Sequence, residues 1–429
     1  MIEPFFQKTV LTNGLRVVTV NQPQLHSAEM VCYVGVGSRN ETPATAGTSH
    51  FLEHMLFRGT AEHATSLELE SAFEMIGGAV NASTDAETTC FHSRLHPQRL
   101  AEGAQLFAAM IRRPRFGDLE VERKIILEEA MEDLNEKGEM INPDYLTGQL
   151  LWPGHPLSLP TIGTLEAIRA QSLDGLRHYL QQYYTPTNIV LTVAGAVEHG
   201  AAVAAAEMAF GDWHGIPAPP PQRLPLPVET ALPELAWIRD SDSQINLQLA
   251  FPTPGRDDER QMCFRVLRRM LAWGGTSRLM HGLRERLGLV YHVDANLSMF
   301  VDGGVFSIDL TTTPVNLVAA VGETLSILAA VRDTPVTVEE LTRVKQSYLY
   351  ALDFSRDHAE EMATRYGWGE LTGCVRDIEQ DRHDIEAVTA ADLLAVARDV
   401  FRGTLLKGAI VGPWKKTDIT AVKKLLAKF

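Results

Sequence analysis

The chain has 429 residues and a formal net charge of -15, and 45% of its residues are hydrophobic and 22% are charged. A chain of this length is expected to form two domains of roughly 200 residues each, and its composition is that of a globular protein rather than a disordered one. The negative charge opposes binding to nucleic acid or to an anionic membrane surface, because both would repel the protein before any contact formed.

The N-terminal residues and the cysteines indicate the compartment in which the chain works. The first twenty residues lack a basic segment followed by an apolar one, and no window approaches about 18 uninterrupted apolar residues, so we expect neither a signal peptide nor a membrane-spanning helix. Cys32, Cys90, Cys263 and Cys374 lie far apart and form no CxxC pair, which is typical of reduced thiols. The sequence therefore predicts a cytoplasmic protein that does not insert into membranes.

The stretch GTSHFLEHMLFRGT, residues 47–60, predicts an amphipathic helix that carries metal-binding residue types. The Gly-Thr-Ser at its start offers N-capping groups, and Gly59 is suited to end it. His50 and His54 are four residues apart, so they stand one turn above the other on one face, with Glu53 beside them. Two imidazoles at this spacing can bind one tetrahedral Zn²⁺, and a carboxylate that is not a ligand can take a proton from the water that the metal activates. This HxxEH pattern predicts a zinc site, which needs a third protein ligand.

The third ligand is expected from the acidic stretch GDLEVERKIILEEAMEDLNE, residues 117–136. Its pattern predicts a helix on which Glu122 and Glu129, seven residues apart, share one face, while Glu128 points about a quarter-turn away. A solvated acidic face is the alternative interpretation, and it is what most such runs form. Spacing alone does not choose among the three glutamates.

A proline-rich stretch, GIPAPPPQRLPLPVETALP at residues 215–233, divides the chain into two halves. Proline fixes φ and removes a hydrogen-bond donor, so this stretch cannot sustain a helix or a central strand. We interpret it as a linker between a metal-binding domain at 1–214 and a second domain at 234–429.

The two halves resemble each other. The strand-like run MVCYVGVGSRNE is echoed by INLQLAFPTPGRDDE, and aligning Arg39 with Arg256 gives a repeat of 217 residues (256 minus 39). Each half reads as strands interleaved with long helices. We therefore predict an α+β fold of two homologous domains, each with an antiparallel-rich mixed sheet packed with helices. The repeat places Leu267, Met270 and Leu271 opposite the His-Glu-His triplet, so the fold itself does not require polar residues there.

The motifs resemble those of a known family. HFLEH followed, after 74 intervening residues, by the last glutamate of ERKIILEE is similar to the zinc peptidases of the pitrilysin and insulysin superfamily, in the branch of the mitochondrial processing peptidase and its bacterial relatives. The resemblance implies that His50, His54 and Glu129 bind Zn²⁺. It also implies that Glu53 is the general base and that Glu122 orients a zinc-binding histidine.

The run GGAVNASTDAETTCFHSRL, residues 77–95, resembles the edge strand of that family, to which an extended peptide substrate adds as a further strand. The resemblance implies that Asn81 and Ala82 bind substrate. The alternative interpretation of the same residues is an ordinary half-buried hairpin with Asn81 in a turn.

The run GGTSRLMHGLRERLGLVY, residues 274–291, resembles the C-terminal signature of the family. The resemblance implies that Arg284 and Tyr291, seven residues apart, donate hydrogen bonds to the oxyanion that forms during peptide hydrolysis. Without the family, Arg284 would be interpreted as a surface residue and Tyr291 as a half-buried strand residue.

The loop WPGHPLSLPTIGT, residues 152–164, departs from the family at one position. The family reads His-Pro-Leu-Gly, and here Ser158 stands in place of the glycine, which restricts the backbone if that position needs a positive φ. We interpret His155 as a loop residue rather than a metal ligand.

The resemblance implies a zinc endopeptidase that hydrolyses peptides or unfolded segments inside a chamber formed by two chains. A homodimer is expected, and a heterodimer with a related chain also fits. The alternative is a catalytically silent subunit that has a structural role or holds substrate, because the superfamily also includes core proteins of larger complexes.

Overall fold

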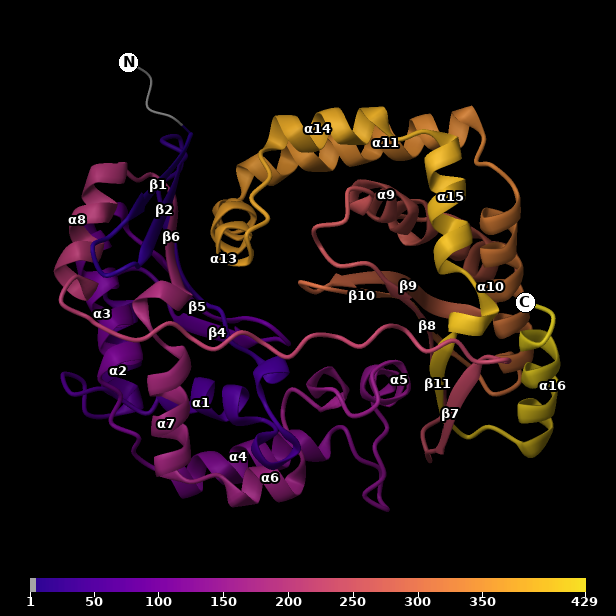
Figure 1. Ribbon diagram of the computed structural model, residues 1–429, viewed down its shortest axis with the longest axis horizontal. Coiled ribbons are helices and arrows are strands. Elements are labelled where there is room, and N and C mark those ends of the chain that lie inside the picture. The colour runs from indigo at the N-terminus through magenta and orange to yellow at the C-terminus, as the bar shows by residue number, and fades with distance from the viewer. Residues whose placement is uncertain (1–4) are drawn as a thin grey trace. The chain divides into compact units, whose positions relative to one another are not determined.

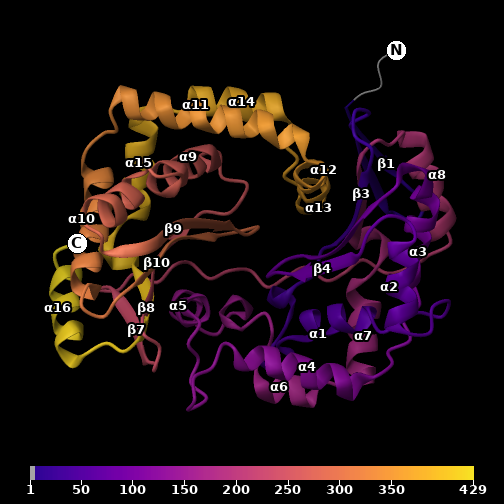
Figure 2. The same ribbon diagram turned by 180° about the vertical axis from the view of Figure 1, so that it is seen from behind.

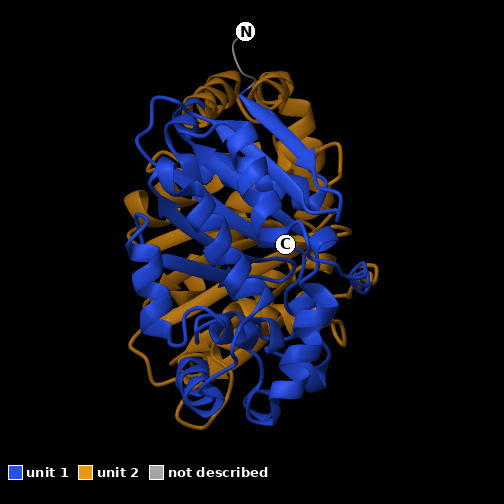
Figure 3. Cartoon of the chain, turned by 90° about the vertical axis from the view of Figure 1, so that its left-hand side faces the viewer, with its two compact units in different colours: residues 1–130, 159–222, 353–377 blue, residues 131–158, 223–352, 378–429 orange. Residues whose placement is uncertain are grey.

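The computed structural model describes residues 5–429, so the first four residues of the predicted first domain lie outside it. The chain forms two compact units, coloured separately in Figure 3. Unit 1 comprises Met1–Ala130, Leu159–Gln222 and Asp353–Asp377, and unit 2 comprises Met131–Ser158, Arg223–Leu352 and Ile378–Phe429. The predicted domains at 1–214 and 234–429 follow the order of the chain, whereas each unit takes one segment from the opposite half.

Unit 1 is built on a six-stranded mixed sheet. Its strands are β1 (Phe6–Val10), β2 (Arg16–Asn21), β3 (Ala28–Val34), β4 (Val80–Thr84), β5 (Thr89–Leu95) and β6 (Ile189–Gly195). They lie in the order β1-β2-β6-β3-β5-β4, with β2 and β6 parallel and the other neighbours antiparallel. β3 and β6 are apolar runs buried along their whole length, as expected where both faces of a sheet are covered. β4 is the last strand of the sheet and alternates buried with more exposed residues.

Helices cover both faces of this sheet. They are α1 (Thr48–Leu56), α2 (Ser66–Glu74), α3 (Leu100–Arg112), α4 (Leu119–Met131), α6 (Leu165–Ala170), α7 (Leu173–Tyr183), α8 (His199–Phe210), α12 (Ala359–Ala363), the π-helical turn η8 (Thr364–Trp368) and α13 (Gly369–Thr372). Figures 1 and 2 show α3 and α8 on one face, and α12 and α13 on the other. α1 contacts β4, so the helix with the HxxEH pattern lies beside the edge strand.

Unit 2 repeats this topology. Its strands β7 (Glu234–Arg239), β8 (Ile245–Thr253), β9 (Val290–Met299), β10 (Gly304–Thr312) and β11 (Lys407–Gly412) lie in the order β7-β11-β8-β10-β9. The first pair is parallel and the others are antiparallel, which matches the order β2-β6-β3-β5-β4 of unit 1 strand by strand. Its helices are α5 (Pro143–Leu151), α9 (Gln261–Ala272), the π-helical turn η6 (Met280–Arg286), α10 (Leu317–Asp333), α11 (Val338–Phe354), α14 (Ile378–Ala387), α15 (Ala390–Val400) and α16 (Lys416–Leu426). The predicted α+β fold with an internal repeat is confirmed.

The repeat also holds for the helix equivalent to α1. Leu267, Met270 and Leu271 lie in α9 and are at most 2% exposed. Apolar side chains therefore fill the positions that histidine and glutamate occupy in α1, and they pack as an ordinary core face.

Each sheet takes one covering segment from the opposite half of the chain. In unit 2, α5 packs on β8 and β11, where Leu146 joins an apolar cluster with Ala409 and Val411. In unit 1, α12 and η8 pack on β3 and β6. A shift of 217 residues moves α5 from 143–151 to 360–368, which fall within α12 and η8. The two segments that cross to the opposite unit are therefore equivalent in the repeat.

The proline-rich stretch runs between the two halves of the chain without regular structure. Residues 215–233, all of which the structure describes, contain no helix or strand. Within residues 5–429, no helix is both long enough and apolar enough to cross a membrane.

The start of α1 is held by a buried carboxylate from the loop before it. Gly47 has a φ of 85°, and a Cβ there would lie 2.3 Å from the carbonyl oxygen of Ile162, so only glycine fits. The N-cap residue is Gly47, within the predicted Gly-Thr-Ser, but it makes no side-chain capping hydrogen bond. Glu41 accepts the N–H groups of Gly47 and Ser49 instead, each at 2.7 Å, and thereby satisfies donors that the helix leaves open.

We expect Glu41→Ala to destabilise the protein by about 1–3 kcal/mol, because it leaves two buried N–H groups without an acceptor. Burial raises the pKa of Glu41 to about 7, so the folded state holds this proton more tightly than the unfolded chain does. The resulting stabilisation is present at low pH and is lost as the pH rises through 7. Denaturant unfolding of both proteins should therefore show a difference that is largest below pH 4.5 and shrinks as the pH rises from 4.5 to about 7. The exposed Glu74, at the end of α2, provides the control Glu74→Ala, for which we expect little change at any pH.

Candidate metal centre

α1 places two histidines on one face. His50 and His54 lie one helical turn apart, and their Nε2 atoms are 3.2 Å from each other. Both are partly buried, with side chains 13% and 23% exposed, so the face that they share is shielded on most sides but open to solvent.

Glu129 of α4 joins the two histidines. Its Oε1 lies 3.5 Å from Nε2 of His50, and its Oε2 lies 3.7 Å from Nε2 of His54. A tetrahedral zinc centre with bonds of about 2.0–2.1 Å places neighbouring ligand atoms about 3.3 Å apart. The three observed distances are near that value, so the two imidazoles and the carboxylate fit a zinc ion with one position left for water or substrate. Glu128 is exposed and contributes no atom to this cluster.

The protonation of His50 suits a metal ligand. Burial, together with the neighbouring His54, lowers the pKa of His50 to about 4, so its ring is neutral near pH 7. Its Nδ1 is buried and has no hydrogen-bond partner among the described residues, whereas its Nε2 faces the cluster. A neutral imidazole with Nε2 directed at the other ligands is the form that binds zinc.

His54 is oriented by a buried carboxylate. Its Nδ1 lies 2.8 Å from Oε1 of Glu122, and Nε of Arg58 donates to the other oxygen. Burial opposes ionisation of Glu122, but these two hydrogen bonds outweigh it and lower the pKa of this carboxyl. Such a carboxylate fixes the ring and its tautomer, leaving Nε2 free for a metal. Arg58 was not predicted from the sequence, because it lies past the end of α1 and its partner Glu122 comes from α4.

Glu53 lies on the same helix but outside the group of metal-ligand atoms. It is 8% exposed, and the hydroxyl of Thr84, the last residue of β4, donates to its Oε2. Burial raises the pKa of Glu53, against the effect of that hydrogen bond. Thr84 was not predicted, because only the pairing of β4 with β5 brings the end of the hairpin to α1.

Asn81 and Ala82 lie within β4 at the edge of the sheet. Asn81 is exposed and Ala82 is half-buried, and the turn that follows contains neither of them. The hairpin alternative, in which Asn81 lies in a turn, is therefore not the observed conformation.

Arg284 and Tyr291 lie in unit 2, on η6 and β9. The Arg284 guanidinium is 5.2 Å from the centre of the Tyr291 ring, within the range of a cation–π contact. Tyr291 is 80% exposed, so it is not the half-buried strand residue of the alternative interpretation. Their role in catalysis stays a prediction.

The loop at 152–164 accommodates its serine without strain. Within residues 5–429, Phe116 and Asp118 are the only residues other than glycine with a positive φ, so Ser158 does not need the conformation that glycine favours. Its hydroxyl donates to the carbonyl oxygen of His155 at 2.7 Å. His155 is 3% exposed and lies outside the group of metal-ligand atoms.

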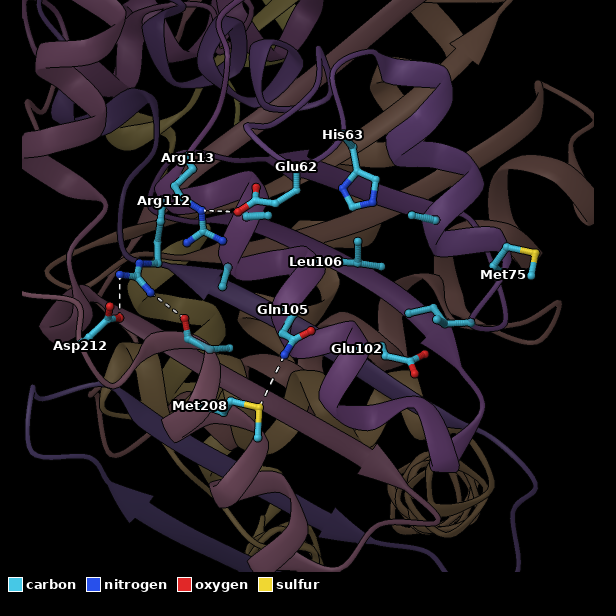
Figure 4. Close-up of a pocket in the computed structure, with 15 residues that line it drawn as sticks. Glu62, His63, Met75, Glu102, Gln105, Leu106, Arg112, Arg113, Met208 and Asp212 are labelled. Atoms are coloured by element: carbon cyan, nitrogen blue, oxygen red, sulfur yellow. Dashed lines mark hydrogen bonds and ion pairs between the residues drawn. The ribbon is translucent and has the colours of Figure 1, made fainter.

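A cavity of about 620 Å³ lies elsewhere in unit 1, against α2, α3 and α8 (Figure 4). Its two arginines are already in ion pairs, Arg112 with Asp212 at 2.8 Å and Arg113 with Glu62 at 2.6 Å. The cavity shares no residue with the metal cluster, so the candidate chemistry is located at α1 and α4 instead.

Comparison with known proteins extends over nearly the whole chain. Residues 16–165 match the domain described as Insulinase (Peptidase family M16), and residues 171–348 match the domain described as Peptidase M16 inactive domain. A protein of Mycobacterium leprae named an uncharacterized zinc protease is 32% identical over 96% of this chain and 93% of its own length. The chain belongs to peptidase family M16. A protein of Bacillus subtilis named an uncharacterized zinc protease is 29% identical over 91% of this chain and 94% of its own length.

Solved structures of M16-like proteins share the fold. A protease from Helicobacter pylori gives a TM-score of 0.88 at 21% identity and covers 96% of this chain and all of that one (100%). The peptidase M16 inactive domain from Pseudomonas fluorescens gives a TM-score of 0.85 at 19% identity, and it covers 95% of this chain and 98% of that one. The second M16 domain of the present chain carries apolar residues at the positions equivalent to the histidines, which agrees with the description of that domain as inactive.

The two adjacent glutamates of α4 give a matched test of the metal centre. We expect Glu129→Gln to lose bound zinc, because an amide replaces the charged oxygen ligand, whereas Glu128→Gln should keep about one zinc per chain. Elemental analysis of both dialysed proteins measures the difference. Equal zinc content in the two variants would contradict the assignment of Glu129.

Proposed function

We propose that this M16 protein is a zinc-dependent endopeptidase that hydrolyses peptides or unfolded segments. The observation that carries the proposal is the convergence of His50, His54 and Glu129 at distances that suit one tetrahedral zinc ion, with the buried carboxylate of Glu53 on the same helix. When bound, zinc would polarise the scissile carbonyl and make the attacking water more acidic.

Glu53 would act as the general base of the reaction. Its carboxylate takes a proton from the attacking water and returns it to the leaving amine, which is the task of a carboxylate beside a metal but outside its ligands. Two features support this role. The Thr84 hydroxyl fixes one oxygen of Glu53, and the raised pKa from burial makes the carboxylate a better base than one in water.

Recognition of the peptide would use the edge of the sheet in unit 1. An extended substrate can pair with β4, whose outer edge no other strand of the sheet takes, so main-chain hydrogen bonds would hold any peptide in register. Asn81 and Ala82 would line this strand. Arg284 and Tyr291 would donate to the oxyanion, and the contact between their side chains supports their action as a pair.

We further propose that two chains enclose the reaction chamber, in a homodimer or with a related partner. Enclosure would restrict substrates to peptides and unfolded segments, because a folded domain could not enter. The alternative, a catalytically silent subunit, would lack one or more of the residues that bind the metal. The complete set of ligands and the separate base favour an active enzyme over that alternative.

Glu53→Gln separates catalysis from metal binding. We expect the variant to keep about one zinc per chain and to lose about 10²–10⁴-fold in kcat, because the amide cannot accept the proton. Cleavage of a quenched fluorescent peptide, before and after chelation, measures the activity, and elemental analysis measures the zinc. An active Glu53→Gln enzyme would overturn the assignment of the base.

Tyr291→Phe tests the oxyanion donor. Removal of the phenol should lower kcat by about 10²–10³-fold, as measured for other oxyanion donors, while zinc content and thermal midpoint stay close to wild type. The exposed Tyr350 of α11 provides the matched control, because Tyr350→Phe removes the same group from a residue with no proposed role. The oxyanion role fails if the two variants are equally active.

A further inference from the structure

We propose that Trp368, which comes from the second half of the chain, is a positioning residue for Glu53. The inference rests on the proposed function, in which Glu53 is the general base. It concerns how unit 1 holds that carboxylate in place.

The contacts that link Glu53 to Trp368 begin at the hydrogen bond between Thr84 and Glu53. Thr84 is the last residue of β4, and the turn to β5 follows it directly. Any movement of this turn therefore moves the hydroxyl that fixes one oxygen of Glu53. The position of the base depends on how rigid the turn is.

Several contacts from the first half of the chain hold the turn. Within the turn, Oδ1 of Asp85 accepts the N–H of Thr88 at 2.8 Å, and the N–H of Asp85 donates to the carbonyl of Thr88 at 2.8 Å. The N–H of Arg39 donates to the carbonyl of Ala86 at 2.8 Å. Nη1 of Arg39 also donates to Oε1 of Glu87 at 2.6 Å, and none of these contacts engages the side chain of Thr88.

Trp368 supplies that remaining contact. Its Nε1–H donates to Oγ1 of Thr88 at 3.1 Å, and Thr88 is 4% exposed. A buried hydroxyl that loses its partner is left with an unmet hydrogen bond, so this contact restrains the turn. The second half of the chain thus reaches the hairpin that holds Glu53.

The conformation of η8 aims the indole. A Cβ at Gly367 would lie 2.0 Å from Oγ1 of Thr192, so only glycine lets the π-helical turn approach β6 this closely. Trp368 follows directly and is directed to the turn between β4 and β5. Single π-helical turns are frequent at functional sites.

Trp368→Phe and Thr88→Val remove the two ends of this hydrogen bond, and Thr88→Val does so with little change in size. Each should lower kcat about 3- to 10-fold, the range for loss of one neutral hydrogen bond, without changing KM or zinc content. The kcat of the double variant should be no lower than that of either single variant. Thr88→Ser keeps the hydroxyl and should therefore keep wild-type kcat. Hydrogen–deuterium exchange of residues 84–89 should be faster in Trp368→Phe and Thr88→Val than in the wild type.

Trp414 provides the matched control in unit 2. Its Nε1–H donates to the carbonyl of Ile238 at 2.8 Å, so Trp414→Phe removes the same kind of bond far along the chain from the hairpin. It should leave kcat and the exchange of residues 84–89 unchanged. A Trp368→Phe enzyme with wild-type kcat, or an equal loss in Trp414→Phe, would overturn the proposal.

Failure of the proposed function gives a different result. If the zinc-loaded wild type cleaves no peptide, the endopeptidase assignment falls, and exchange of residues 84–89 alone decides whether Trp368 restrains the turn. Wild-type exchange rates in Trp368→Phe would then reject the proposal on structural grounds.

Discussion

The metal centre depends on how α4 is fixed against α1, because two histidines at helical spacing form no tetrahedral site until a third ligand comes within about 3.3 Å of both. Arg123, the residue after Glu122, provides much of this fixation. Its guanidinium donates to the carbonyl oxygens of Ile168 and Gln171, at 2.6 and 2.9 Å, at the end of α6, where a helix leaves acceptors without partners. The same group lies 5.7 Å from the centre of the Phe51 ring on α1. Arg123 therefore ties α4 both to the end of α6 and to α1.

Local donors satisfy the buried carboxyl groups near α1. An unpaired buried carboxylate is costly, and each of the three beside this helix has its own donors. Glu41 accepts hydrogen bonds from two backbone N–H groups. Glu122 accepts a hydrogen bond from Arg58 and is hydrogen-bonded to His54, and Glu53 accepts a hydrogen bond from the Thr84 hydroxyl. Unit 2 builds the same topology with leucine and methionine at the equivalent helix. The polar set in α1 is therefore an addition to the fold, and it is stable only because loops and the hairpin supply its partners.

The sequence predicts what local periodicity determines. The spacing of His50 and His54, the strand and helix pattern, and the repeat follow from residue order, and the fold confirms the last two. Spacing could not choose Glu129 over Glu128, because the choice depends on the rotation of α4 against α1. The bonds of Glu41 and Thr84 depend on how a loop and a hairpin pack on the helix. Such contacts join residues that no periodic pattern relates.

The exchanged segments lay beyond prediction for a related reason. A proline-rich linker suggests two independent halves, yet α12 and η8 complete the cover of the first sheet and α5 completes that of the second. Central strands that are buried on both faces require a covering layer, and the layer that packs best need not come from the same half. The chain crosses between its units after Ala130, Ser158, Gln222, Leu352 and Asp377. Each half of the sequence contains all the strands of its own sheet but not the whole covering layer, and so residues 353–377 belong physically to the unit that carries the metal ligands.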